Sequence, residues 1–305
     1  MRSITLVACA LMVVTSSAST FAEESCRGLF EDAGFARFRL QSGRLVLDPI
    51  QYRKGTQKRE RDGRSETIVL SSAQGVPSLH YTSEDDYQRV QMLAEHGKSL
   101  RIESTILATG EVGVYTQVVG EPIVFRTQRG NAQLNGEVQG KTLLHIVGQD
   151  EAGFQVHLES LLTRMLRGRS VLAITLQTHQ YLSKNLTKLP AISINELESI
   201  IEELRHPEIT HRRDASRKLA ELGSLASPFL VSALRRDDLD SEQRARIEHV
   251  VRRSDRYDED TVTSLAFLLS TDRHHWSIIA KRLDQQDWLA ANHHIRRCGL
   301  PDLKR

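Results

Sequence analysis

Between Gly43 and Val147 the hydrophobic positions form short runs that alternate with polar residues and are broken by turn residues. Such short runs are typical of β-strands. Glycine, asparagine and proline separate most of them at close intervals, which favours sequential antiparallel hairpins over a parallel sheet. The pattern predicts a β-rich region that forms a meander or a partial barrel. The expected strands are residues 44–47, 67–70, 100–105, 112–119, 123–127, 132–138 and 143–147.

One helix is expected to interrupt these strands, over residues 83–97. Ser83 and Asp86 have the spacing of a capping box at the start of a helix, and Gly97 marks its end. Its apolar stripe would consist of Tyr87, Val90 and Leu93 or Ala94. Strands with a helix among them, followed by a helical region, predict an α+β fold.

Helical spacing of apolar residues begins after the β-rich region. Asp150 is expected to cap a helix that ends at Gly168, while residues 170–182 fit a helix or a strand, of which we favour the helix. Residues 185–190 indicate a linker, because Pro190 disfavours helical conformation at the residue before it. Ser193 and Glu196 have the spacing of a second capping box. We therefore place a domain boundary at this linker.

Residues 207–254 predict a succession of paired helices. In the first helix, Ala215 and Leu219 lie on one stripe, and Gly223 can provide the cap that ends it. Pro228 would lie in the first turn of the second helix, where a missing N–H costs nothing. Asp240 or Ser241 can cap the third. The residues that these helices would bury are Ala215, Leu219, Leu222, Phe229, Leu230, Ala233, Leu234, Ile247, Val250 and Val251.

This stretch also carries the spacing Arg212-x-x-Ala215-x-x-x-Leu219-x-x-x-Gly223, followed by Ala226-x-Pro228 and later by Glu242 and Arg244. In this it resembles a HEAT-type helical repeat, over about a sixth of the chain. The resemblance implies stacked helical pairs that present an extended face to another protein. Three more helices are expected over residues 261–269, 274–283 and 287–298, as the end of a repeat array or as a bundle.

The first residues have the order of an export signal. Arg2 precedes an apolar run and a small, polar stretch that ends at Ala22, where we expect cleavage. Cys9 also fits the lipidated position of a bacterial lipoprotein, which is an alternative. No later segment has the roughly 20 apolar residues that a membrane-spanning helix needs. We thus expect a periplasmic or secreted mature chain that does not span a membrane, with the segments 1–22 (signal peptide), 23–150 (β-rich α+β domain), 151–192 (helical connection and linker) and 193–305 (HEAT-like helical domain).

Composition narrows the possible partners. The net charge of the 305 residues is +2 and becomes +1 when Arg2 is removed, so no global electrostatic attraction to nucleic acid is expected. Basic residues crowd positions 53–64, which could contact phosphate or an anionic membrane surface, but we interpret them as a solvated hairpin loop. The acidic run from Glu84 to Asp86 fits the first turn of the predicted helix.

Chemistry-bearing motifs are absent from the sequence: it contains no nucleophile elbow, zinc-protease motif, phosphate-binding loop, EF-hand loop or Cys-x-x-Cys pair. We therefore predict no catalytic residue and no cofactor, and favour a non-enzyme. His274, His275, His294 and Cys298, with His293 beside them, are weak candidates for a metal site, although solvated side chains explain them better. Cys26 and Cys298 either form a disulfide or remain two thiols.

Together these observations predict an exported, non-enzymatic module that binds another protein through its helical pairs. The alternative is a small-ligand carrier or an enzyme with its pocket in the β-rich region. The interior of that region distinguishes them. An apolar cavity favours a carrier, converging carboxylates or histidines favour an enzyme, and a filled core favours the interaction module.

Overall fold

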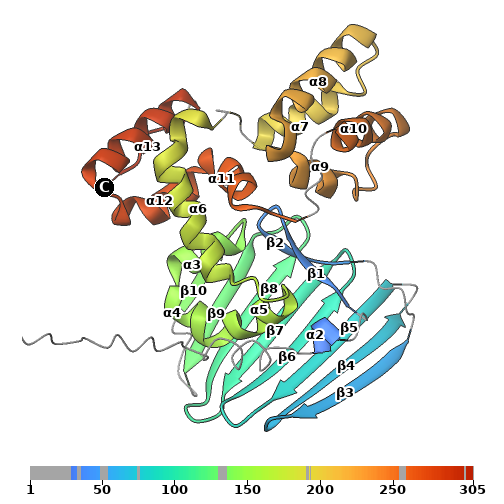
Figure 1. Cartoon of the computed structure of the whole chain (residues 1–305), viewed down its shortest axis with the longest axis vertical. Coiled ribbons are helices and arrows are strands. Elements are labelled where there is room, and N and C mark those ends of the chain that lie inside the picture. The colour runs from blue at the N-terminus through green and yellow to red at the C-terminus, as the bar shows by residue number, and fades with distance from the viewer. Residues whose placement is uncertain are drawn as a thin grey trace, which may run out of the picture.

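The computed structural model describes residues 29–32, 36–48, 54–73, 76–129, 136–189, 192, 194–253, 259–298 and 300–304. Helices cover one face of an antiparallel sheet, and further helices extend from one end of that layer (Figure 1). An antiparallel β-region followed by a helical region confirms the predicted α+β arrangement. The predicted signal peptide, Cys9 and Cys26 lie outside the described residues.

Eight strands form one meander, in which each strand pairs with its neighbours in sequence and every pairing is antiparallel. The strands are β3 (Gly55–Arg61), β4 (Arg64–Ala73), β5 (Val76–Glu84), β6 (Gln88–Glu95), β7 (Ser99–Ile106), β8 (Glu111–Val118), β9 (Ile123–Arg129) and β10 (Gly136–Gly140). Residues alternate between the two faces, as the two-residue period of a strand requires. In β5, Leu79 and Tyr81 are fully buried, whereas His80 and Thr82 are exposed.

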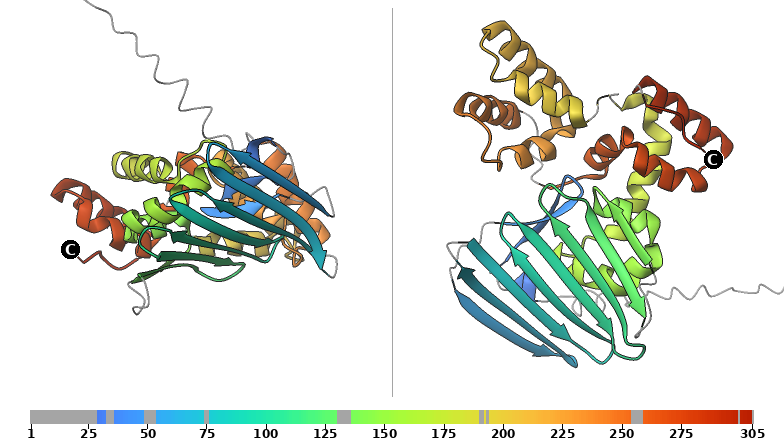
Figure 2. Two further views of the ribbon diagram at one scale, coloured as in Figure 1. Left: turned by 90° about the horizontal axis from the view of Figure 1, so that it is seen from below. Right: turned by 180° about the vertical axis from the view of Figure 1, so that it is seen from behind.

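The buried face of the sheet is covered by helices that follow β10 directly (Figure 2). These are α3 (Leu143–Gln149), α4 (Glu151–Phe154), a π-helical turn (Gln155–Glu159) and α5 (Ser160–Met165). The next helix, α6 (Val171–Asn185), extends away from the sheet (Figure 1). The Asp150 side chain caps α4 by accepting a hydrogen bond from the Gly153 N–H, as the sequence predicted. Phe154 and Leu158 lie in the same core as Tyr115 and Phe125 of the sheet. The short α2 (Leu29–Asp32) packs against β4 and α5.

A separate hairpin of β1 (Phe38–Gln41) and β2 (Arg44–Leu47) is attached near the end of β8. The Gln117 side chain bonds the backbone of Leu45 in both directions, with its Oε1 3.1 Å from the Leu45 N and its Nε2 2.7 Å from the Leu45 O. Arg44 donates to the carbonyl of Val118 at 2.8 Å. The hairpin is thus joined to β8 by side-chain hydrogen bonds, whereas the strands of the sheet are joined by backbone pairing.

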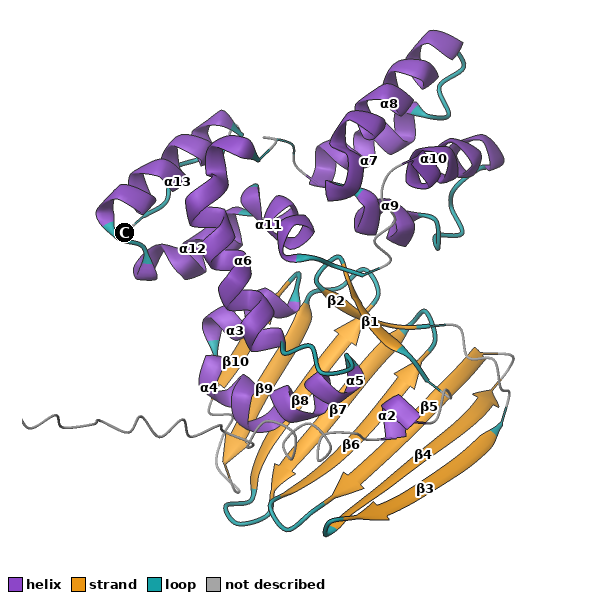
Figure 3. Cartoon of the chain, viewed as in Figure 1, coloured by secondary structure: helices purple, strands orange, loops and turns teal. Residues whose placement is uncertain are grey.

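Two groups of helices follow (Figure 3). The first comprises α7 (Ile194–Glu203), α8 (Ile209–Leu222), α9 (Ser227–Ala233) and α10 (Ser241–Arg253), and the second α11 (Val262–Ser270), α12 (Arg273–Ile279) and α13 (Gln285–Arg297). Gly223 ends α8 with a φ of +56°, and Asp240 caps α10 through the Gln243 N–H at 2.7 Å, both as expected. α11 and α13 pack back against α6.

The junction between the hairpin and the second group of helices centres on Asp260, just before α11. The Gly43 N–H donates to its Oδ2 at 2.6 Å, and the Asp260 N–H donates to the Leu40 carbonyl at 2.8 Å. Arg169 donates to the Asp260 carbonyl at 2.6 Å. Asp260 therefore joins the hairpin, the loop before α6 and the start of α11.

Three predictions within the sheet region are wrong. The helix expected over residues 83–97 is the end of β5, a turn and β6, and the strand expected over residues 143–147 is α3. The described part of the basic segment is not a loop, because it forms β3 and the start of β4, joined by a tight turn at Asp62 and Gly63. Both turn residues have positive φ, which matches the twist of a two-residue hairpin. Among the described residues, none of the helices has the length and apolar character to cross a membrane.

Candidate functional site

Polar side chains that are buried between the sheet and its helices are the places to look for chemistry. The first group is built around His157, which lies in the π-helical turn that interrupts the α4–α5 helix. Its ring lies on Gly113 of β8, where an added Cβ would be only 2.5 Å from the ring carbon Cγ. The absence of a side chain at Gly113 therefore makes room for the histidine.

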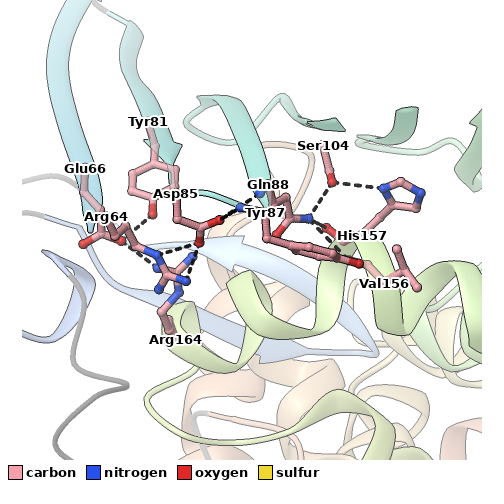
Figure 4. Close-up of polar contacts among 10 residues, drawn as sticks. All are labelled: Arg64, Glu66, Tyr81, Asp85, Tyr87, Gln88, Ser104, Val156, His157 and Arg164. Carbon is pink, nitrogen blue, oxygen red and sulfur yellow. Dashed lines mark hydrogen bonds and ion pairs between the residues drawn. The ribbon is translucent and has the colours of Figure 1, made fainter. Parts of the chain in front are cut away.

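Hydrogen bonds fix the orientation of the His157 ring and determine which ring nitrogen carries the hydrogen (Figure 4). The Gln88 Nε2 donates to the Ser104 Oγ at 2.6 Å, so the Ser104 hydroxyl hydrogen is available to the His157 Nδ1, 3.0 Å away. This leaves the Nε2–H facing the Glu111 carboxylate at 3.6 Å. Burial lowers the pKa of His157, against the opposing effect of Glu111.

This hydroxyl–imidazole–carboxylate order resembles that of a hydrolase, in which a base activates a serine. However, Ser104 is 0% exposed and His157 1% exposed, so a substrate has no access to the hydroxyl. The Gln88 Nε2 also donates to the His157 carbonyl at 3.1 Å, which ties the π-helical turn to the sheet. The geometry is that of an anchor between layers.

A buried ion pair forms the second group. The Arg164 Nη1 of α5 lies 2.7 Å from the Glu66 Oε1 of β4, and the Tyr81 hydroxyl donates to the same oxygen at 2.7 Å. Burial raises the pKa of Tyr81 above its ordinary value, so this hydroxyl stays protonated as a donor. Both charged side chains are less than a tenth exposed. Their contacts hold α5 on the sheet.

The acidic run from Glu84 to Asp86 lies in the β5–β6 turn and not at a helix start. Asp85 accepts from the backbone N–H groups of Tyr87 and Gln88, and pairs with the Arg64 Nη2 at 2.8 Å. Glu84 pairs with Arg89 at 2.7 Å. These carboxylates border an open hollow at the β3–β4 and β5–β6 turns, and their hydrogen bonds shape the turn.

The third group is a cluster of four histidines where α3, α6 and α12 meet. His145 and His275 are buried, His179 is half-buried and His274 is exposed. His145 lies with its ring centre 5.1 Å from that of His274 and 5.0 Å from that of His275, and the rings of His179 and His275 are also 5.0 Å apart. The Thr142 Oγ1 is 2.9 Å from the His145 Nδ1. Sequence analysis identified only the two α12 members of this cluster.

The remaining metal candidates lie apart in α13. The His294 Nε2 is 3.6 Å from the Cys298 Sγ, and His293 is exposed. His275 and His294 are buried, so the interpretation of these side chains as solvated is wrong for both. Within the described part of the chain, no three or more His, Cys, Asp or Glu side chains are placed to hold a metal ion. Cys298 forms no disulfide with another described residue, and its pairing with Cys26, which lies outside the described residues, stays a prediction.

The sequence carries little that would have revealed His145 and His179. His145 lies in a segment predicted as a strand, and its partners on α12 are more than a hundred residues away. The one local signal is Gly140, whose missing side chain makes room for His145: a Cβ there would be 2.1 Å from the His145 Cβ. No protein-family model, curated protein or solved structure matches this chain.

Proposed function

We propose that the protein is exported after cleavage at Ala22 and binds another protein through the surface of α7–α10. One observation carries the proposal: these four helices pack in pairs beside the sheet, whose interior is filled, and each helix adds buried side chains to the hydrophobic core. α7 packs against α8, α8 against α10, and α10 against α9. The buried side chains are Leu197, Ile200, Ile201, Leu204, Ala215, Leu219, Phe229, Leu230, Ala233, Ile247, Val250 and Val251.

This succession of two helical pairs supports the HEAT-type interpretation. Polar contacts fix the pairs: the Gln243 Nε2 of α10 donates to the Ile201 carbonyl of α7 at 3.0 Å, and the Arg236 Nη1 pairs with Glu198 at 2.6 Å. Arg246 reaches from α10 to the Ser216 Oγ of α8 at 3.3 Å. Paired helices fixed in this way form the rigid surface that stacked repeats use for binding. A domain division at residues 183–193 is part of this proposal.

The exposed side of α8 is the face that we assign to the partner. Ile209, Arg213, Asp214, Arg217 and Glu221 are all exposed along it. They combine an apolar side chain with charges of both signs, which suits a protein partner better than the uniformly anionic backbone of a nucleic acid.

The filled interior of the sheet region weighs against the carrier and enzyme alternatives. Leu79, Tyr81, Ile102, Tyr115 and Phe125 line the covered face, and each is at most 1% exposed. The imidazole of His157 and the carboxylate of Glu66 lie there in two separate groups, and both are engaged in contacts between layers. A ligand carrier needs an apolar hollow, and an enzyme needs access to its reactive groups.

Crosslinking in the full-length protein tests the proposal. Photoreactive residues at Arg213 and Glu221 of α8 are compared with matched ones at Thr82 and Gln91, which are exposed on the open face of the sheet. We expect the α8 positions to yield adducts with one recurring protein of the exported fraction, and the sheet positions to yield none. Adducts only at Thr82 and Gln91, or at no position, would contradict the assignment.

A further inference from the structure

The C-terminal helices are held on the sheet layer where α12 meets α3 and α6, and the histidine cluster occupies this contact. His145 contributes from α3, His179 from α6, and His274 and His275 from α12. The same contact buries Trp276, whose Nε1 donates to the Ser270 carbonyl at 2.7 Å. Gly148 of α3 leaves room for Ile278 of α12. Attachment of α12 thus depends on close packing around the imidazoles.

Several ring nitrogens of the cluster are buried without a hydrogen-bond partner among the described residues. His275 is 0% exposed, and neither of its ring nitrogens has a hydrogen-bond partner among the described residues. The Nε2 atoms of His145 and His179 are also buried and without such a partner. An imidazolium donates from both nitrogens and carries a charge that is costly to bury unpaired.

The charged groups around the cluster can offset only one proton. Asp272 lies with its Oδ2 3.5 Å from the His145 Nε2 and 3.8 Å from the Lys141 Nζ, while its Oδ1 accepts from the His275 N–H. On the other side lies Arg282, which pairs with Glu151 of α4 at 3.3 Å. His274 is exposed, so water can solvate its imidazolium. Among His145, His179 and His275, one carboxylate leaves any second imidazolium without a counter-charge.

We propose that this cluster is an acid-operated latch, which holds α12 on α3 and α6 while its histidines are neutral and releases α12 when they are protonated. Release converts the buried rings into solvated imidazolium ions. It also exposes Trp276 and Ile279 of α12 to water. The sheet and its α4–α5 cover remain folded, because their contacts with His157 and Arg164 do not involve the latch.

The direction of the pH effect follows from proton binding. Burial lowers the pKa of His179 to about 4 and that of His275 well below its ordinary value. Released histidines titrate near their ordinary value of about 6.5, so the released state binds more protons below that pH. From His179 alone, the ratio of released to attached molecules rises about 20-fold between about pH 7 and about pH 5.

Trp276 provides the measurement. In a Trp288→Phe background it is the one tryptophan left in the chain, and its emission maximum reports burial. We expect a red shift between pH 7 and pH 5, with hydrogen exchange increasing in α12 peptides and not in β5–β8 peptides. His275→Phe and His179→Phe each keep a ring of similar shape without a proton-accepting nitrogen, and each should reduce the shift severalfold. His80→Gln, on the open face of the sheet, should leave it unchanged.

His179 is only half-buried, so its substitution keeps the test decisive should His275→Phe fail to fold. An emission maximum that does not move down to pH 5 would overturn the latch. So would equal loss of protection in α12 and in the sheet, since that is global unfolding. Stabilisation at pH 7 by added zinc ions that both substitutions abolish would also overturn it, because the cluster would then be a metal site.

Discussion

Arg164 brings a positive charge into the protein interior, where an ion pair with Glu66 stabilises it. Its guanidinium meets the Glu66 carboxylate, which also receives the Tyr81 hydroxyl. Desolvation of such a pair can cost as much as the attraction returns, so the pair adds little net stability. Replacing only one partner of the pair is destabilising, because the charge of the other partner stays buried without a counter-charge.

Arg164→Met therefore should lower the free energy of unfolding by about 3–5 kcal/mol. Glu66→Gln should also destabilise, while the double variant should lose less than the sum of the two single variants, because no buried charge is left alone. Urea denaturation of the four proteins measures this cycle. Additive losses would show that the two side chains do not act as a pair.

Gly113 makes a second residue-level prediction. A Cβ at this position would overlap the His157 ring, whereas at Gly136 of β10 the nearest side-chain atom, the Thr127 Oγ1, is 3.7 Å away. Gly113→Ala should cost about 1–3 kcal/mol through overpacking, and Gly136→Ala much less. Thermal unfolding compares them. Equal effects would mean that the π-helical turn can move away from the sheet at no cost.

At the scale of elements, α8 depends on one buried stripe. Leu219 is fully buried against the neighbouring helices, whereas Arg213 is exposed. Leu219→Ala should lower the free energy of unfolding by about 2–5 kcal/mol, because it removes contacts and leaves a cavity. Arg213→Ala should change it by under about 0.5 kcal/mol. Chemical denaturation separates the two, and similar effects would refute the helical pairing.

Sequence periodicity predicted α8 and α10 well, because each has apolar residues at helical spacing and a capping residue, Gly223 at the end of α8 and Asp240 at the start of α10. The error over residues 83–97 has a specific cause. Val90 and Ala94 are four residues apart, a spacing shared by one helical turn and by alternate residues of a strand. Met92 decides between them: it is buried together with both, as only a strand allows. The exposed side chain of Tyr87, 55% accessible, also breaks the expected stripe.

The strand expected over residues 143–147 failed for a related reason. Leu143, Leu144, Ile146 and Val147 are all buried, and a short continuous apolar run does not distinguish a buried strand from a buried helix. The histidine cluster escaped prediction because it forms only when α3, α6 and α12 pack together. Local spacing can identify a pair such as His274 and His275, but not the distant residues that meet it.

At the scale of the whole molecule, Asp260 links the hairpin to α11. Burial raises its pKa to about 7, against the hydrogen bonds that it accepts from the Gly43 and Ser42 N–H groups. The folded state therefore binds more protons than the unfolded state between about pH 4 and about pH 7, and this carboxyl's contribution to stability is lost as the pH rises through that range.

Asp260→Asn should remove this dependence, because its amide oxygen can still accept from Gly43 and carries no charge. Relative to the variant, the wild-type protein should become less stable as the pH rises from 4 to 7, by up to about 4 kcal/mol. Denaturant melts across this range measure the difference. Asp237→Asn, at an exposed position, serves as the control, and a difference curve as flat as that of the control would contradict the prediction.

The order of the strands also determines which contacts can form first while the chain is being synthesised. Each strand of the sheet can pair as soon as the next one leaves the ribosome, since loop closure between sequence neighbours costs little entropy. The β1–β2 turn must wait, because Gly43 and Asp260 are 217 residues apart. At about 5–20 residues per second that interval is roughly 10–40 s. During it the hairpin can use its contacts with β8 and with α3, where the Leu143 N–H donates to the Gly43 carbonyl at 2.8 Å, but not those with Asp260. The nascent chain then has a folded sheet whose β1–β2 turn is not yet joined to α11.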